Sequence, residues 1–206
     1  KGLVLTHGHE DHIGAIPYLL KEINVPIYGT GLTLGILEKK LKEHGLSSTA
    51  KLNTVKAGTK IKLGSFGIEF IRTNHSIADA CALAIITPCG IVIHTGDFKV
   101  DYTPIDGAPI DLMRFAELGE KGVLLLMADS TNAERKGFTM SEKTVGATFD
   151  DIFSKTKGRL IVATFSSNVH RVQQIIDTAV KFKRKCVICG RSMVNVIDVA
   201  LQTGYM

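Results

Sequence analysis

The chain alternates short apolar runs with amphipathic stretches of helical length, and this alternation restricts it to a layered α/β fold. Leu3 to Thr6 and Val123 to Met127 are apolar runs that are long enough for a strand but too short for a helix. Between residues 13 and 23, and again between 34 and 41, apolar side chains recur at the spacing of one helix face. Strands that alternate with such helices are typical of sheets covered by helices.

Residues 49–94 predict a β-meander. Their apolar runs are short and are separated by turns that contain glycine, such as Pro88-Cys89-Gly90. The strands expected here are residues 61–63, 68–72, 82–86 and 91–94. A helix over residues 111–120 and the strand that ends at Met127 complete this part of the chain.

After Ser141 the pattern changes to a regular alternation of helices and strands. Helices are expected from Glu142, from Asn168 and at the C-terminal end, with strands over 160–165 and 186–189 between them. We therefore place a domain boundary near residue 140, with one domain over 1–140 and another over 141–206. Cys186 and Cys189 lack a second ligand pair, so core packing is favoured over metal binding for both.

Charge is the informative part of an otherwise ordinary globular composition. No apolar run approaches the roughly 20 residues of a membrane helix, and four cysteines are too few for a disulfide scaffold. We therefore expect a soluble, cytoplasmic protein with no membrane partner. The net charge is +5, and nine Lys and Arg face only two Asp from Lys155 onward. This basic block suits a polyanion, although a solvated surface is the simpler alternative.

The run Thr6-His7-Gly8-His9-Glu10-Asp11-His12 places three imidazoles and Asp11 directly after a buried strand. Alternation at the strand end puts His7 and His9 on the same side, whereas Asp11 and His12 fall where the chain turns into the next helix. Neutral imidazoles and carboxylates suit a divalent ion such as zinc, in sites with open coordination positions. The alternative, surface histidines in a polar loop, explains this spacing poorly.

Two further candidate ligands follow later strands. His75 comes after the 68–72 run, and Asp97 lies in the turn after the 91–94 run. Taken alone, each is more often a turn or cap residue. Because each follows a strand as His7 does, the three together favour a shared metal site.

These motifs resemble the ordered ligand motifs of the metallo-β-lactamase superfamily. In their detailed residue sequence they resemble the ribonuclease J family of its β-CASP group. The segments that carry the resemblance are residues 7–20 (HGHEDHIGAIPYLL), 74–79 (NHSIAD), 95–99 (TGDFK), 129–134 (DSTNAE) and 164–174 (TFSSNVHRVQQ). The resemblance spans essentially the whole chain. It implies an α/β fold in which a partial metallo-β-lactamase-like αββα sandwich is followed by the start of a βα-type β-CASP domain.

The resemblance also implies two zinc ions, or manganese or another divalent ion in their place. The residues implied to hold them are His7, His9 and His75 for one ion, Asp11 and His12 for the other, and Asp97 as the bridge. A role in orienting a histidine ring is the alternative for Asp97. Two ions roughly 3.5 to 4 Å apart lower the pKa of a shared water, so that a metal-bound hydroxide can attack a phosphodiester. No serine lies in a G-x-S-x-G context, which argues against acyl-enzyme chemistry.

Further site residues are expected beside the metal ligands. Asp11 and Asp129 are the expected catalytic carboxylates, although Asp129 also suits a turn. Backbone N–H groups and hydroxyls before the helix at Asn168 suit phosphate, although simple N-capping is an equal alternative. The candidate substrate-binding residues are Ser130, Ser166, Ser167, Asn168 and Arg171. His170, next to Arg171, is a weaker candidate for contact with an RNA phosphate.

The function expected from these features is that of a zinc-dependent ribonuclease, a 5′ exonuclease or an endonuclease or both, with RNA as its partner. A hydrolase of a small ester or thioester is the alternative, and an RNA-binding module without zinc is a third. The resemblance further implies a homo-oligomer and additional family motifs, including the last zinc ligand, outside these 206 residues. We therefore expect a piece of a longer protein that by itself binds zinc poorly and has little nuclease activity.

Overall fold

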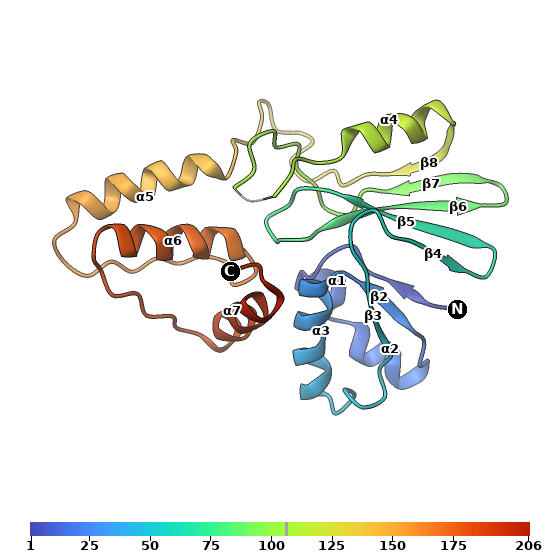
Figure 1. The fold of residues 1–206 in the computed structure, drawn as a ribbon, viewed down its shortest axis with the longest axis horizontal. Coiled ribbons are helices and arrows are strands. Elements are labelled where there is room, and N and C mark those ends of the chain that lie inside the picture. Colours follow the sequence, from blue (N-terminus) through green and yellow to red (C-terminus); the bar gives the residue numbers. More distant parts are fainter. Residues whose placement is uncertain (106) are drawn as a thin grey trace.

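The computed structural model describes residues 1–105 and 107–206, and its first layers are a small parallel sheet and the helices that cover it (Figure 1). The sheet has the order β1-β2-β3. Its strands are β1 (Leu3–Val4), β2 (Ile27–Gly29) and β3 (Leu52–Thr54). The helices are α1 (Glu10–Ile13), α2 (Ile16–Glu22) and α3 (Gly31–Glu43). The single helix expected over 13–23 is therefore interrupted, and Pro17, which lacks an N–H group, lies in the first turn of α2.

The second sheet has five strands in the order β4-β5-β6-β7-β8. They are β4 (Lys60–Leu63), β5 (Phe66–Arg72), β6 (Cys81–Thr87), β7 (Gly90–His94) and β8 (Val123–Met127). The first four pair antiparallel, which confirms the meander, and β8 joins β7 in parallel. Helix α4 (Leu112–Glu120) follows the meander and covers the outer face of this sheet.

The two sheets pack face to face, and the alternation of side chains along β5 shows how. Ile68 and Phe70 point towards the first sheet, where they pack with Leu83 and with residues of β1 and β2. Ile71 points the other way, onto Leu118 of α4. Complete burial of a side chain such as Phe70 contributes roughly 1.5 to 3 kcal/mol. Helices, two sheets and a further helix thus form the αββα layers that the sequence led us to expect.

The C-terminal part consists of three helices that lie to one side of the sheets (Figure 1). They are α5 (Lys143–Lys155), α6 (Val169–Lys181) and α7 (Arg191–Thr203). Helices α5 and α6 share a small aromatic core, and α7 packs along α3 of the first part. The boundary near residue 140 stays a prediction. Among residues 1–105 and 107–206, no helix combines the length and the apolar character needed to cross a bilayer.

The strands expected over 160–165 and 186–189 are wrong. Neither segment pairs with another strand in the described part of the chain, and Ile161 and Val187 are 89% and 79% exposed. The expected core packing of Cys186 and Cys189 is wrong as well, because both are exposed. An apolar run satisfies only one condition for a strand, since its N–H and C=O groups also need a ladder partner.

Candidate metal centre

The candidate site lies at one edge of the second sheet, where three strands of the same direction end. Strands β5 and β7 both run antiparallel to β6, and β8 runs parallel to β7. The loops that carry His75, Asp97 and Asp129 therefore leave the sheet at the same edge. The end of β1 reaches this edge too, because the Cys81 amide at the start of β6 donates a hydrogen bond to the Thr6 carbonyl at 2.9 Å.

The loop after β1 presents its histidines to this edge at close range. His7 is 0% exposed, and its Nδ1 lies 3.0 Å from the Thr6 hydroxyl, which leaves Nε2 facing the cluster. His9 has an extended backbone at the N-cap of α1, and His12 lies within that helix. Gly8 lets the loop lie against α3, because a Cβ there would be 3.2 Å from Thr33 Cα.

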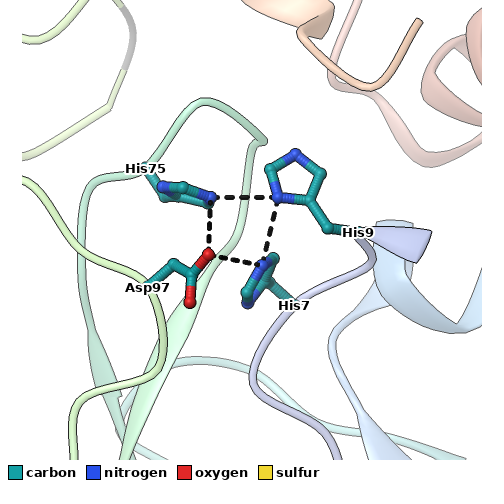
Figure 2. A group of neighbouring side chains, drawn as sticks. All are labelled: His7, His9, His75 and Asp97. Atoms are coloured by element: carbon teal, nitrogen blue, oxygen red, sulfur yellow. Dashed lines mark hydrogen bonds and ion pairs between the residues drawn. The ribbon is translucent and has the colours of Figure 1, made fainter. Parts of the chain in front are cut away.

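Four side chains from three loops converge on one point, as Figure 2 shows. The Nδ1 atom of His9 lies 3.1 Å from His7 Nε2 and 3.0 Å from His75 Nε2. Asp97 Oδ2 lies 3.8 Å from the same His7 atom and 3.6 Å from the same His75 atom. Ligand atoms placed tetrahedrally around zinc, at roughly 2.1 Å from it, lie roughly 3.4 Å apart. The four distances are close to this spacing, and all four donors lie within 4.8 Å of one another, which is near enough for them to share one divalent ion.

A second set of donors adjoins the first across Asp97. His12 Nε2 lies 3.3 Å from Asp97 Oδ1 and 3.6 Å from Asp11 Oδ2. The two oxygens of Asp97 thus face different groups, Oδ2 towards His7 and His75 and Oδ1 towards His12. This is the placement that a bridging carboxylate requires. The structure brings all six expected ligands together, and their roles as ligands stay predictions.

Burial keeps the imidazoles of the first set neutral. Desolvation lowers the pKa of His7 to about 2, and the neighbouring His12, His75 and His9 lower it further. Burial also lowers the pKa of His75 to about 4, with His9 acting in the same direction and Asp97 in the opposite one. The pKa of His9 is lowered mainly by burial too. Neutral rings keep the lone pairs that a metal ion needs, so the donor chemistry suits a cation at physiological pH.

The turn that carries Asp97 is held in place by its neighbours. Gly96 has a φ of +59°, and a Cβ there would be 3.0 Å from Thr6 Cβ. Its N–H group donates to His94 Nδ1 at 3.0 Å. The Thr95 hydroxyl donates to the Gly96 carbonyl at 2.6 Å and accepts the Asp129 amide at 3.0 Å. These supporting roles were not predicted from the sequence. His94 directly precedes the T-G-D motif, but nothing else in the sequence indicates that it supports the turn.

Asp129 lies in a turn, which is one of the two interpretations that the sequence left open, and its catalytic role stays a prediction. Its Oδ1 accepts hydrogen bonds from the Thr131 amide at 2.9 Å and the Thr131 hydroxyl at 2.7 Å, as in a turn. Burial acts to raise its pKa, but the bonds from Thr131 and from the Phe98 backbone, with His75 nearby, lower it overall. A charged carboxylate therefore lies beside His75, where it favours a cation.

A cavity of about 910 Å³ opens at this site and reaches the C-terminal part of the chain. His75, Asp97 and Asp129 line it, together with His170 of α6. It is also lined by three basic residues that were not among the expected site residues: Lys56, Arg72 and Lys99. Lys99 ends the TGDFK segment that carries the family resemblance, whereas nothing in the local sequence distinguishes Lys56 or Arg72 from other surface cations.

The five expected substrate-binding residues do not line this cavity within the described part of the chain. Asn168 is 4% exposed, and its Oδ1 accepts the Arg171 amide at 3.1 Å as the N-cap of α6, which favours the capping alternative. The Arg171 guanidinium pairs with Glu142 at 2.5 Å. Ser166 shares a hydrogen bond with Ser192 at 2.8 Å, and Ser130 is exposed. Substrate contact by these residues, and by Ser167, stays a prediction.

Comparisons with known proteins cover both parts of the chain. The metallo-beta-lactamase superfamily matches residues 1–133, and the beta-CASP domain of ribonuclease J matches residues 157–206. Among solved structures, a protein of unknown function from Enterococcus faecalis V583 has a TM-score of 0.67 at 20% identity. That match covers 100% of this chain and 49% of the other, and it shows a shared fold alone.

Curated relatives named ribonuclease J match the chain from end to end. The identity is 50% over 206 residues with the protein from Helicobacter pylori (strain J99), 53% over 208 residues with that from Synechocystis, and 47% over 213 residues with that from Thermus thermophilus. Each alignment covers 100% of this chain but only 30%, 32% and 37% of the respective relative. The chain thus spans about a third of the length of these relatives.

Proposed function

Because the chain belongs to the metallo-beta-lactamase superfamily, we propose that its candidate metal centre hydrolyses the phosphodiester bonds of RNA, in RNA processing and decay. The single observation that carries this proposal is the convergence of neutral His7, His9 and His75 on the Asp97 carboxylate, at the wall of a large cavity. The similarity to ribonucleases J over the whole chain supports RNA as the substrate class.

The residues divide into two ligand sets. His7, His9 and His75 would hold one zinc ion, Asp11 and His12 the other, and Asp97 would bind both. Such ions, when bound, supply a water of lowered pKa and positive charge next to the scissile phosphate. The nitrogen and oxygen donors also suit manganese, so zinc is the proposed rather than the necessary metal.

Charged side chains of the chain itself would contact the substrate and support the metal centre. Lys56, Arg72 and Lys99 would be the cavity's contacts for RNA phosphates, among the five carboxylates that also line it. Asp11, whose side chain is 79% exposed, would act at the solvent-facing side of the centre. The charged Asp129 carboxylate, near His75, would favour a cation at the centre, and the Asp129 backbone amide ties its loop to the Thr95 hydroxyl.

The test is to measure metal content and RNA cleavage with the full-length protein. We expect about two equivalents of zinc, and cleavage that is lost with a chelator and restored with zinc. His7→Ala should abolish both metal binding at the first set and cleavage. His44→Ala is the matched control, because His44 lies at the end of α3 with its ring against Tyr18, outside the cluster.

Substrate ends and competing substrates sharpen the test. A 5′-monophosphorylated RNA and a circular RNA of the same sequence separate 5′ exonuclease from endonuclease activity, and we propose that the protein has one or both. Faster hydrolysis of a generic thioester than of RNA would contradict the proposal. A cytoplasmic location and a homo-oligomeric full-length protein also stay proposals.

A further inference from the structure

The loop that carries His75, residues 73–80, is closed at its base and held on one side by the first part of the chain. The Thr73 amide donates to the Ala80 carbonyl at 3.2 Å. The Asn74 carbonyl accepts the Lys99 amide at 2.7 Å, and Asn74 Oδ1 accepts the Ile110 amide at 2.7 Å. The backbone on the N-terminal side of His75 is therefore fixed by neighbours next to the Asp97 turn.

The C-terminal side of the same loop is held by a different set of elements. Ile77, Ala78 and Ala80 are almost fully buried, in a cluster with Leu32 of α3. The rest of the cluster comes from the C-terminal helices: Val169 of α6 and Val196, Val199 and Ala200 of α7. One half of the ligand loop is thus part of the contact between the two parts of the chain.

Asp79 lies at the centre of this contact. Its φ is +55°, a conformation that non-glycine residues rarely adopt. Its Oδ2 accepts the Leu32 amide in the first turn of α3 at 2.9 Å, where the partial positive charge of the helix end favours a carboxylate. Burial raises the pKa of Asp79, and interactions with the Leu32 backbone and the Thr30 and Tyr205 side chains oppose that rise.

Helices α3 and α7 are in close contact, so a shift of one helix would displace the other. A Cβ on Gly35 of α3 would be 2.5 Å from Val199 Cγ1 of α7, so only glycine allows this approach. Lys39 Nζ of α3 lies 2.6 Å from Asp198 Oδ2 of α7. Tyr205, two residues after α7, packs against the same cluster, and its side chain acts to lower the pKa of Asp79.

We propose that Asp79 is a positioning residue for the ligand His75, and that it makes metal binding depend on how the C-terminal helices pack against α3. This inference rests on the proposed metal centre. The Asp79 carboxylate ties the backbone four residues after His75 to the first turn of α3, beside the cluster that this loop shares with the C-terminal helices. Its loss would loosen this side of the loop. Without Asp79, the His75 loop would have to become ordered when the metal binds. This ordering would make the binding free energy less favourable.

The test measures zinc affinity, by competition with a chelator, and amide hydrogen exchange of residues 73–80 in the metal-free full-length protein. Removing groups that orient metal ligands typically lowers metal affinity about 10- to 100-fold, and Asp79 acts at one remove from His75. We therefore expect D79A to lower zinc affinity about 10-fold and to speed exchange in the loop. D79N should fall between D79A and the unaltered protein, because asparagine tolerates a positive φ and keeps an acceptor for the Leu32 amide.

Two further variants separate positioning from general stability. Y205F removes one interaction with Asp79 and should lower zinc affinity by about 2- to 3-fold, a small step on the same scale. D150N removes the Lys181 ion pair between α5 and α6, which involves neither the ligand loop nor the α3–α7 contact, and it should leave zinc affinity unchanged. If D79A does not fold, D79N and Y205F carry the test.

Zinc affinity and loop exchange that are the same in D79N, Y205F and the unaltered protein would overturn the inference. An equal loss of affinity in D79A and D150N would overturn it as well, because the effect would then be one of general stability. Failure of the proposed function looks different, since the unaltered protein would then bind no zinc or, with zinc bound, would not cleave RNA.

Discussion

Lowering the pH should destabilise the metal-free protein, because its central imidazoles are held neutral. The pKa is about 2 for His7 and about 4 for His75, against 6.5 for the unfolded chain. Below pH 6.5 the unfolded chain therefore binds more protons than the folded protein, and the free energy of unfolding falls as the pH is lowered. The loss continues down to pH 4 for His75 and further for His7.

The size of the effect follows from these pKa values. Between pH 7 and pH 5, each group loses about 2 kcal/mol of stability, so His7 and His75 together lose about 4 kcal/mol. Other groups also titrate in this range. Asp79 has a raised pKa and acts in the opposite direction, since its protonation favours the folded state as the pH falls. A difference between variants is therefore a cleaner measure than the total.

The assay is urea unfolding at pH 7, 6 and 5 with a chelator present, on the unaltered protein and on His75→Gln. Glutamine does not titrate, so the variant should lose about 2 kcal/mol less between pH 7 and pH 5. His44→Ala, which removes a histidine outside the cluster, is measured beside it as the control for a substitution elsewhere. Identical pH profiles for His75→Gln and the unaltered protein would refute the conclusion that burial keeps these rings neutral.

Two substitutions test how the site and the outer helix are held. G96A should lower the free energy of unfolding by about 1 to 3 kcal/mol in urea titrations and weaken zinc binding, because it strains a positive φ and brings a Cβ to 3.0 Å from Thr6 Cβ. R114M should cost about 2 to 3 kcal/mol, because it leaves Glu69, which is almost buried and paired at 2.7 Å and 2.8 Å, without its guanidinium. K155M breaks an exposed pair, so its free energy of unfolding should stay within about 0.5 kcal/mol of that of the unaltered protein. If R114M lost no more stability than K155M, the role given to the Arg114–Glu69 pair would be contradicted.

The first half of the fold could be predicted because its pattern is local. Each strand of the meander is bounded by turn residues, and alternation along β5 assigns Phe70 and Ile71 to opposite faces. The short strand β3 was missed, since its three residues show no clear periodicity. The segments 160–165 and 186–189 were misassigned for a different reason: whether an apolar run pairs depends on distant partners, which the run itself does not encode.

The candidate site was predictable in its residues but not in its geometry. Strand ends marked His7, His75 and Asp97, because side chains that follow parallel-running strands meet at one edge. Asp97 turns one carboxylate oxygen towards each set of donors. This placement depends on the register of β5, β6 and β7, and no single sequence motif encodes that register. For Asn168 the sequence left capping and phosphate binding equal, and the hydrogen bond to the Arg171 amide favours capping.

The ligand positions differ in what holds them, and this has a consequence for function. His7 and Asp97 are fixed by groups of the sheet edge itself, through Thr6 and Thr95. His75 is fixed on one side by that edge and on the other by helices that also bound the cavity. Under the proposed function, an RNA bound in the cavity that displaced α7 relative to α3 would therefore act on His75 and leave His7 and Asp97 in place. Substrate binding and metal geometry would then be coupled through the 73–80 loop. Measuring the zinc affinity of the Asp79 and Tyr205 variants would test this coupling.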